Sequence, residues 1–330
     1  MDLSSLNLPD WSTRPLIYIG LATLLYATFQ LASQASVYLH RGTLKTRYNQ
    51  PNQSNWALVT GATDGIGFGF SQELCERGFN VILHGRNATK LQRRQAELAR
   101  EFPAQKTGIL CMDITATDET IDLLADKIQK IIHIAAEQEG KLTVLVNNVG
   151  GDIGTPFSTL SSLSYADTEA TIALNASFMA HATRVLLPIL ARNAPGLILN
   201  VSSVAAYGMP YVSLYSGTKG FVNSFTRALE AESKAEGWGV EVLGLRVAQV
   251  RSAGLDYVKP GLFVPDSRTM AAAGLDRVGC GQVIVAGYFW HWLLCLSLDL
   301  LPRWLMMKIT VGKTQELKAK EEEKKKNKTT

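Results

Sequence analysis

The chain has 330 residues and a formal net charge of +4, and its length suits one large α/β domain with appendages. Residues 313–330 hold seven lysines and four glutamates, so the rest of the chain is nearly neutral and gives no indication of nucleic-acid binding. The four cysteines lie far apart and form no CxxC pair, which argues against a zinc site or a disulfide framework and favours a reducing compartment. We therefore expect no metal and no nucleic-acid partner.

The first predicted element is an uncharged apolar stretch over residues 15–39, which follows a short lead of residues 1–14. As a helix, its 25 residues would span the ~30 Å of a bilayer's hydrocarbon core. A buried core helix and a cleaved signal peptide are the alternatives. The lead contains two aspartates and one arginine, unlike the positive n-region of a signal peptide. We predict a transmembrane anchor, and the three basic residues of 40–47 place the following chain in the cytosol by the positive-inside rule.

After a polar segment at residues 40–55, read as a linker, short β-branched runs alternate with longer helical patterns. The helical segments are Lys90–Glu101, Thr117–Glu139 and Tyr165–Leu190. The strands are expected at Trp56–Thr60, Asn80–His84, Gly108–Met112, Leu142–Val146, Leu197–Val201 and Val240–Leu245. Alternation of this kind, with nearly continuous apolar strands, predicts a Rossmann-type doubly wound parallel sheet with helices on both faces. We assign residues 56–280 to this domain.

A glycine-rich loop joins the first predicted strand to the next helix and forms the candidate dinucleotide site. Glycines let the backbone turn sharply and approach a pyrophosphate, whose charge a helix N-terminus stabilises. The candidate binding residues in this loop are Gly61, Thr63, Asp64, Gly65, Ile66 and Gly67. An ordinary tight turn is the alternative reading.

Arg86 follows the second predicted strand, about 20 residues beyond the glycines. An enzyme that uses NAD carries an acid at this point for the ribose 2′-hydroxyl. A guanidinium instead favours a 2′-phosphate, so we expect NADPH as the cofactor. Asp113 ends the third strand, where it can accept from the adenine amino group.

Tyr215 and Lys219 form the candidate catalytic pair. They are four residues apart at the start of a predicted helix and so share a face. A neighbouring ammonium favours phenolate and is expected to lower the pKa of the tyrosine from its usual value near 10. Such a tyrosine can protonate a ketone oxygen while a nicotinamide delivers hydride to the carbon.

Five motifs in order resemble the short-chain dehydrogenase/reductase family. They are TGATDGIG at residues 60–67, NNVG at 147–150, Asn175, NVSS at 200–203 and YSGTK at 215–219. Within the family, the pattern is most similar to membrane-bound very-long-chain 3-oxoacyl-CoA reductases and their 17β-hydroxysteroid dehydrogenase relatives. The N-terminal apolar stretch and the lysine-rich C-terminus add to that likeness.

The resemblance implies roles for further residues. Asn148 would contact the cofactor, Lys219 would bind its ribose, and the backbone of Asn175 would hold a water in a proton relay through Lys219. A serine would hold the substrate oxygen. Ser202 has the family's usual spacing of 13 residues before the tyrosine, but the strand motif favours Ser203, and both stay open. Relatives carry a proline after the sixth strand in the loop that seats the nicotinamide, whereas this chain reads RVAQV at 246–250.

The C-terminal third begins with a hydrophobic segment, residues 281–312. Its most apolar part, Val283–Leu301, would be a membrane-dipping helix, a substrate-pocket wall or plain core, and His291 within it has no ligand partner at helical spacing, which favours a structural or interfacial role. In the charged tail, residues 313–330, Lys326 and Lys328 lie five and three residues from the end. They resemble a dilysine retrieval signal, with a solubilising charge run as the alternative. We expect the endoplasmic reticulum membrane, with the catalytic domain in the cytosol.

Three functions are weighed against one another. The leading hypothesis is NADPH-dependent reduction of a 3-oxoacyl-CoA to a 3-hydroxyacyl-CoA in fatty-acid elongation. The second is oxidation or reduction of a steroid or another lipophilic ketone or alcohol. The third is a catalytically silent membrane scaffold, against which the intact Tyr215, Lys219 and Asn175 argue. A small lipophilic substrate and the membrane are the expected partners, and a homo-oligomer remains open.

Overall fold

The computed structural model describes residues 10–49, 53–114, 123–136, 140–154, 157–252, 259 and 261–329. The chain divides into two units, Met1–Arg41 and Gly42–Thr330. The strands are β1 (Ser54–Val59), β2 (Asn80–Gly85), β3 (Thr107–Cys111), β4 (Gly140–Asn147), β5 (Gly196–Ser203), β6 (Val240–Val247) and β7 (Ile284–Val285). The helices are α1 (Asp10–Ser36), α2 (Leu44–Tyr48), α3 (Gly65–Glu76), α4 (Ala88–Glu101), α6 (Leu124–Ala136), α7 (Tyr165–Ile172), α8 (Phe178–Arg192), α9 (Ser213–Ala235), α10 (Ser267–Leu275), α11 (Phe289–Leu300) and α12 (Arg303–Thr329).

The first unit contains α1, and the large apolar side chains of this helix are exposed. Its segment Arg14–Ser36 has a mean hydropathy of 1.5 with none of that window buried. At 1.5 Å per residue this segment is about 35 Å long, enough to cross a hydrocarbon core. The N-terminal apolar helix expected from the sequence is therefore present and is a candidate membrane span.

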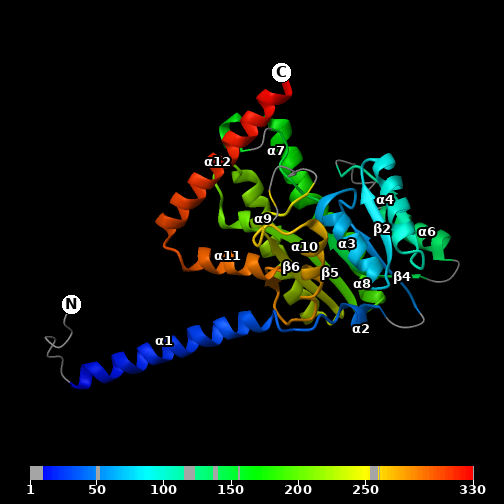
Figure 1. The fold of residues 1–330 in the computed structure, drawn as a ribbon. Coiled ribbons are helices and arrows are strands. Elements are labelled where there is room, and N and C mark those ends of the chain that lie inside the picture. The colour runs from blue at the N-terminus through cyan, green and yellow to red at the C-terminus, as the bar shows by residue number, and fades with distance from the viewer. Residues whose placement is uncertain are drawn as a thin grey trace. The chain divides into compact units, whose positions relative to one another are not determined.

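The second unit is built on a seven-stranded parallel sheet with the order β3-β2-β1-β4-β5-β6-β7 (Figure 1). This arrangement confirms the predicted doubly wound fold, and all six predicted strands form. The two residues of β7 were not predicted. They are too short to carry a periodic pattern, and they are a strand because Ile284 and Val285 pair with Gly244 and Leu245 of β6.

The sheet is buried on both faces, which explains the nearly continuous apolar strands. Side chains alternate along a strand, and Trp56 and Leu58 of β1 pack in one core cluster with residues of α6, α8 and α9. On the other face α10 packs closely on α3 and on β6. A Cβ atom at Gly274 would lie 2.6 Å from Leu245 Cδ1 and 3.6 Å from the Phe70 ring, so a larger residue there would require the Leu245 side chain to move.

Two predicted segments differ from the structure. The segment at 40–55, read as a linker, contains α2, whose Leu44 and Tyr48 are each 1% exposed. The Tyr48 hydroxyl donates to Glu241 of β6, a partner about 190 residues away that no local pattern reveals. The predicted helix at Tyr165–Leu190 is interrupted by a π-helical turn, η3 (Ala173–Ser177), between α7 and α8.

Only part of the predicted helix Thr117–Glu139 can be compared, because residues 115–122 and 137–139 lie outside the described residues. Its described part forms α6. The stretch Tyr165–Arg192 is also long and apolar, but 44% of its most apolar window is buried. The α8 side chains Phe178, Ala182 and Leu186 lie in the core cluster, so this stretch is a core helix of the domain.

The hydrophobic C-terminal segment folds as β7 and α11, and α12 begins in it and continues through the charged tail. Helix α11 has 12 residues and is about 18 Å long, too short to cross a bilayer. His291, Cys295 and Leu298 turn one side of α11 into the domain. Thr310 and Thr314 are buried on α12, so the start of the charged tail packs against other parts of the chain.

Candidate active site

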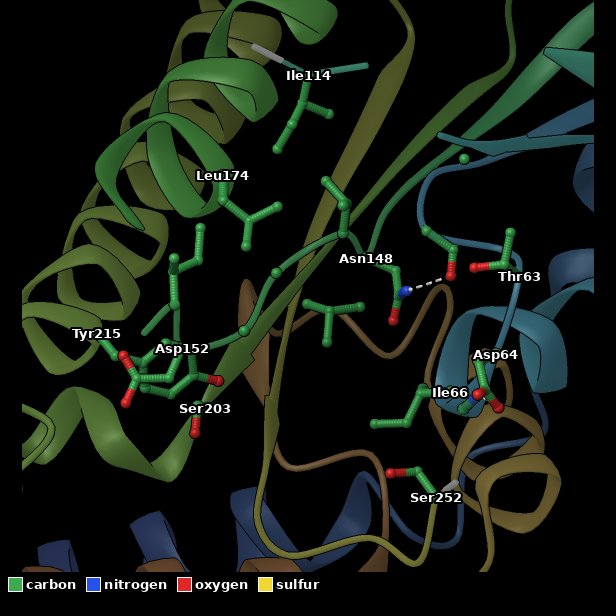
Figure 2. Close-up of a pocket in the computed structure, with 18 of the residues that line it drawn as sticks. Thr63, Asp64, Ile66, Ile114, Asn148, Asp152, Leu174, Ser203, Tyr215 and Ser252 are labelled. Atoms are coloured by element: carbon green, nitrogen blue, oxygen red, sulfur yellow. Dashed lines mark hydrogen bonds between the residues drawn. The ribbon is translucent and has the colours of Figure 1, made fainter. Parts of the chain in front are cut away.

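A cavity of about 940 Å³ lies at the carboxyl ends of the parallel strands. The strand order reverses between β1, which continues to β2 and β3, and β4, which continues to β5 and β6. Open parallel sheets bind ligands in the crevice at such a switch point. Figure 2 shows Tyr215, Ser203 and Asp152 gathered at one end of this cavity and Thr63, Asp64 and Ile66 at the other.

The glycine-rich loop requires glycine at two points. Gly61 has a φ of +68°, a left-handed conformation that residues with a Cβ disfavour. At Gly67 a Cβ atom would lie 2.2 Å from the Gly61 carbonyl oxygen and 2.5 Å from Asn148 Nδ2. Asp64 caps α3, and its side chain accepts from the Gly65 amide at 2.7 Å. The loop thereby brings the positive end of the α3 dipole to the cavity.

The predicted cofactor residues fall into two groups. Those that line the cavity are Gly61, Thr63, Asp64, Gly65, Ile66, Arg86, Asp113, Asn148 and Lys219. Gly67 is buried behind them, where its contact with Gly61 supports the shape of the loop. Arg86 directly follows β2 and is exposed. Asn148 follows β4, and its side-chain amide donates to the Thr60 carbonyl at 3.1 Å, which ties the ends of β1 and β4 together.

The structure separates the two candidate serines. Ser202 and Ser203 point to opposite faces of β5, as successive strand residues do. The Ser202 hydroxyl is buried and donates to the Lys219 carbonyl at 3.1 Å. The Ser203 side chain lines the cavity and is hydrogen-bonded to the Tyr215 hydroxyl. Both serines line the cavity, but the Ser202 hydroxyl is used by Lys219, whereas that of Ser203 is turned toward Tyr215.

Tyr215 and Lys219 share a face of α9, as their spacing predicts. The Lys219 Nζ lies 5.5 Å from the centre of the Tyr215 ring and donates to the Val201 carbonyl at 3.0 Å. Burial lowers the pKa of Lys219 to about 8. Burial thus makes the ammonium form of Lys219 less favourable than in an exposed lysine.

The expectation that Lys219 lowers the pKa of Tyr215 is wrong in this structure. Burial raises the pKa of Tyr215, the hydrogen bond from Ser203 opposes that rise, and the nearby Asp152 carboxylate adds to it. The physical reason is burial, because removal from water penalises the charged phenolate. Tyr215 accordingly holds its proton at neutral pH, which is the form that a proton donor needs.

Asn175 lies in the π-helical turn η3 rather than within a regular helix, and such turns occur frequently at functional sites. Its side chain is 1% exposed and does not line the cavity. The Asn175 amide donates to the Gly151 carbonyl at 2.7 Å, and its oxygen accepts from the Gly151 amide at 2.9 Å. These two bonds fix the loop after β4, next to Lys219.

Asp152 is a site residue that the sequence reasoning missed. It follows the NNVG motif by two residues and lines the cavity beside Tyr215 and Ser203 (Figure 2). Burial raises the pKa of Asp152 above its ordinary value, and a hydrogen bond from the Ile153 amide opposes the rise. An acid at the carboxyl end of a central strand was the available signal. His84 and Ser252 also line the cavity without having been predicted.

Among the residues that the structure describes, no three His, Cys, Asp or Glu side chains are grouped so as to hold a metal ion. The cavity instead fits a dinucleotide. Its volume is at the upper end of the ~300–1,000 Å³ typical of ligand pockets. A helix N-terminus, a close-approach glycine loop and Arg86 follow one another along it, as a pyrophosphate and a ribose phosphate would require.

Comparisons with known proteins agree with this geometry. Residues 55–259 match the family model for short chain dehydrogenase. A very-long-chain 3-oxoacyl-CoA reductase of Bos taurus is 32% identical over 79% of this chain and 80% of its own length. The Mus musculus protein of the same name is 30% identical over 81% of this chain and 82% of its own length.

Among solved structures, a 7β-hydroxysteroid dehydrogenase superposes with a TM-score of 0.66 at 18% identity, covering 81% of this chain and 98% of that one. At this identity the likeness concerns the fold. The family match spans more than half of the chain and includes the glycine loop, Ser203, Tyr215 and Lys219. The chain belongs to the short-chain dehydrogenase family and is an oxidoreductase.

Proposed function

We propose that the protein reduces the ketone of a 3-oxoacyl-CoA to a 3-hydroxyacyl-CoA with NADPH, as a step of fatty-acid elongation. The observation that carries the proposal is the set of Tyr215, Ser203 and Lys219 at one end of a cavity fit for a dinucleotide. The substrate class is supported by the relatives named very-long-chain 3-oxoacyl-CoA reductase, which align over about four fifths of the chain.

The proposed mechanism assigns one task to each side chain. Bound NADPH supplies a hydride to the ketone carbon. Ser203 holds the ketone oxygen by a hydrogen bond next to the Tyr215 hydroxyl. As the carbon–oxygen double bond opens, Tyr215 transfers its proton to that oxygen and becomes a phenolate. A proton from solvent then restores the phenol, and the task of Lys219 is to bind the nicotinamide ribose.

The same residues are proposed to bind the cofactor. The N-terminus of α3 and the loop from Gly61 to Gly65 would hold the pyrophosphate. Arg86 would pair with the 2′-phosphate, and Asp113 and Asn148 would contact the adenosine end and the cofactor backbone. Lys219 would donate to the nicotinamide ribose, which its place at the tyrosine end of the cavity favours.

The test of the substrate is a membrane-fraction assay with NADPH against a long-chain 3-oxoacyl-CoA and, in parallel, a ketosteroid. We expect NADPH oxidation with the 3-oxoacyl-CoA at a kcat/KM well above that for the steroid. A preference for the steroid would replace the proposed substrate. NADPH binding without reduction of any ketone would favour the scaffold hypothesis.

The serine assignment leads to a matched pair of variants. Ser203→Ala removes the hydroxyl that faces Tyr215, and turnover should fall by ~10-fold or more, since a hydrogen bond to the charge that develops in the transition state contributes ~1.5–3 kcal/mol. Ser202→Ala removes the bond to the Lys219 carbonyl, so it should cost ~1 kcal/mol of stability with a smaller loss of turnover. Turnover and thermal unfolding of both variants check this ranking, and the reverse order of turnover would contradict it.

We also propose that α1 anchors the enzyme in the endoplasmic reticulum membrane with the catalytic domain in the cytosol. The span of Arg14–Ser36, its lack of buried side chains and the basic residues that follow it support this placement.

The topology can be measured directly. The full chain should resist extraction from membranes at alkaline pH, and deletion of residues 1–39 should release at least part of the protein into the soluble fraction. Protease added to sealed microsomes should digest the domain. A domain protected inside the vesicles would reverse the proposed orientation, and a full chain extracted without detergent would remove the anchor.

A further inference from the structure

His291 is the one fully buried histidine of α11, and it joins three segments that are far apart in the sequence. It is 0% exposed. Its Nδ1 accepts from the Ala248 amide at 3.2 Å, and its Nε2 lies 3.3 Å from the Phe263 carbonyl oxygen. The Tyr288 ring meets the imidazole edge-on, with 5.2 Å between ring centres. These contacts fix the ring plane as well as its position.

The two hydrogen bonds determine the form of the imidazole. A backbone amide can only donate, so Nδ1 must carry the lone pair. The proton is therefore on Nε2, where it can be donated to the Phe263 carbonyl. Burial lowers the pKa of His291, which agrees with a neutral ring. Both ring nitrogens are thus used by backbone groups, and neither is available to a substrate or a metal.

The segment held by His291 is part of the cavity wall. Val247, the last residue of β6, is the register partner of Ser203 on β5. Val247, Ala248 and Val250 all line the cavity. The segment is held on its other side as well, because the Arg251 amide donates to the Pro265 carbonyl at 2.9 Å. Its position beside Ser203 therefore depends on hydrogen bonds between its own backbone amides and residues outside the sheet.

We propose that His291 is a positioning residue that holds the Val247–Ser252 loop in the shape that binds NADPH. The inference rests on the proposed function for the identity of the cofactor. Among the residues that the structure describes, no other side chain accepts a hydrogen bond from the Ala248 amide. If that acceptor is lost, the amide must move toward water to recover a partner, because an unpaired buried donor is costly. The loop then shifts relative to Ser203, and the cavity wall shifts with it.

Three substitutions at His291 separate positioning from packing. In His291→Asn, the side-chain oxygen can take the place of Nδ1 and still accept from Ala248. In His291→Gln, the longer side chain puts its amide near the position of Nε2, so the bond to Ala248 is lost and the bond to Phe263 can be kept. His291→Phe keeps a ring and removes both bonds. Leu298→Ala is the control, since Leu298 is buried on the same helix and contributes no hydrogen bond to the loop.

The first readout is hydrogen exchange of the full-length protein in a peptide that covers Val247–Ser252, which needs no cofactor. We expect exchange to speed up about tenfold or more in His291→Gln and His291→Phe, the effect of losing about one hydrogen bond. It should stay within about threefold of the native rate in His291→Asn. Leu298→Ala should lower the melting temperature without selective exchange in this peptide.

The second readout is NADPH affinity, measured by fluorescence titration without substrate. The dissociation constant should rise about tenfold in His291→Gln and His291→Phe and remain near native in His291→Asn. If all three variants behave alike and follow their melting temperatures, His291 is merely a core residue and the proposal is overturned. If loop exchange follows the expected order but the native protein reduces no ketone, the positioning role stands and the proposed substrate fails.

Discussion

Replacing Tyr215 with phenylalanine should lower turnover by ~10²–10⁴-fold, the usual contribution of a general acid. The substitution keeps the aromatic ring and its packing and removes the only atom that can donate a proton. The Tyr215 hydroxyl is bonded to Ser203, so the variant should lose at most ~1 kcal/mol of stability. NADPH affinity should remain within a few-fold of native, since the Lys219 side chain is untouched. The measurements are steady-state turnover and NADPH titration.

Tyr211→Phe provides the matched control for that experiment. It removes the same hydroxyl from a tyrosine four residues earlier, whose oxygen accepts from Gln315 at 3.3 Å on the surface. Its turnover should be native. Near-normal activity of Tyr215→Phe with every ketone tested would mean that the proton comes from another group, and Asp152, which lines the same end of the cavity, would then be the first to examine.

The second large effect is expected for Arg86→Asp, which should invert the cofactor preference from NADPH to NADH. A charge-assisted hydrogen bond to a phosphate contributes ~1.5–3 kcal/mol, or about 10- to 150-fold in affinity. The new carboxylate repels a 2′-phosphate and can accept from the 2′-hydroxyl of NADH. The ratio of kcat/KM values for the two cofactors measures the change.

Arg93→Asp makes the same change of charge on α4 and serves as the control. Its side chain is 66% exposed and paired with Glu97 at 3.4 Å, and it does not line the cavity. The preference of this variant should equal that of the native enzyme. Equal use of NADPH and NADH by the native enzyme would contradict the role given to Arg86.

What the sequence by itself determined are the features that depend on neighbours along the chain. Apolar runs separated by helical patterns specify a parallel sheet, because strands covered on both faces must be apolar throughout. The spacing of Tyr215 and Lys219 puts them on one face of a helix. The glycine loop can be recognised because a sharp turn before a helix favours glycine, as at Gly61 and Gly65, which both have a positive φ. These features follow from local backbone geometry and could be read without a structure.

What only the tertiary structure decided depends on contacts between distant segments. Ser202 and Ser203 are identical residues next to each other in the sequence, and only the structure distinguishes their surroundings. The Ser202 hydroxyl donates to the Lys219 carbonyl of α9, and the Ser203 hydroxyl is bonded to Tyr215. Burial by the surrounding elements raises the pKa of Tyr215, whereas the lysine four residues away had predicted a lowered pKa. Spacing along a helix predicts which side chains are neighbours, but it does not predict which other elements bury them.

The same reason applies to the C-terminal third. The sequence left Val283–Leu301 open between membrane, pocket wall and core, because an apolar helix is compatible with all three. The structure pairs β7 with β6 and turns His291 toward Ala248. These hydrogen-bond partners are 43 residues apart, so no periodic pattern in the sequence predicts their contact. Tertiary folding alone therefore gave this segment its connection to the active site.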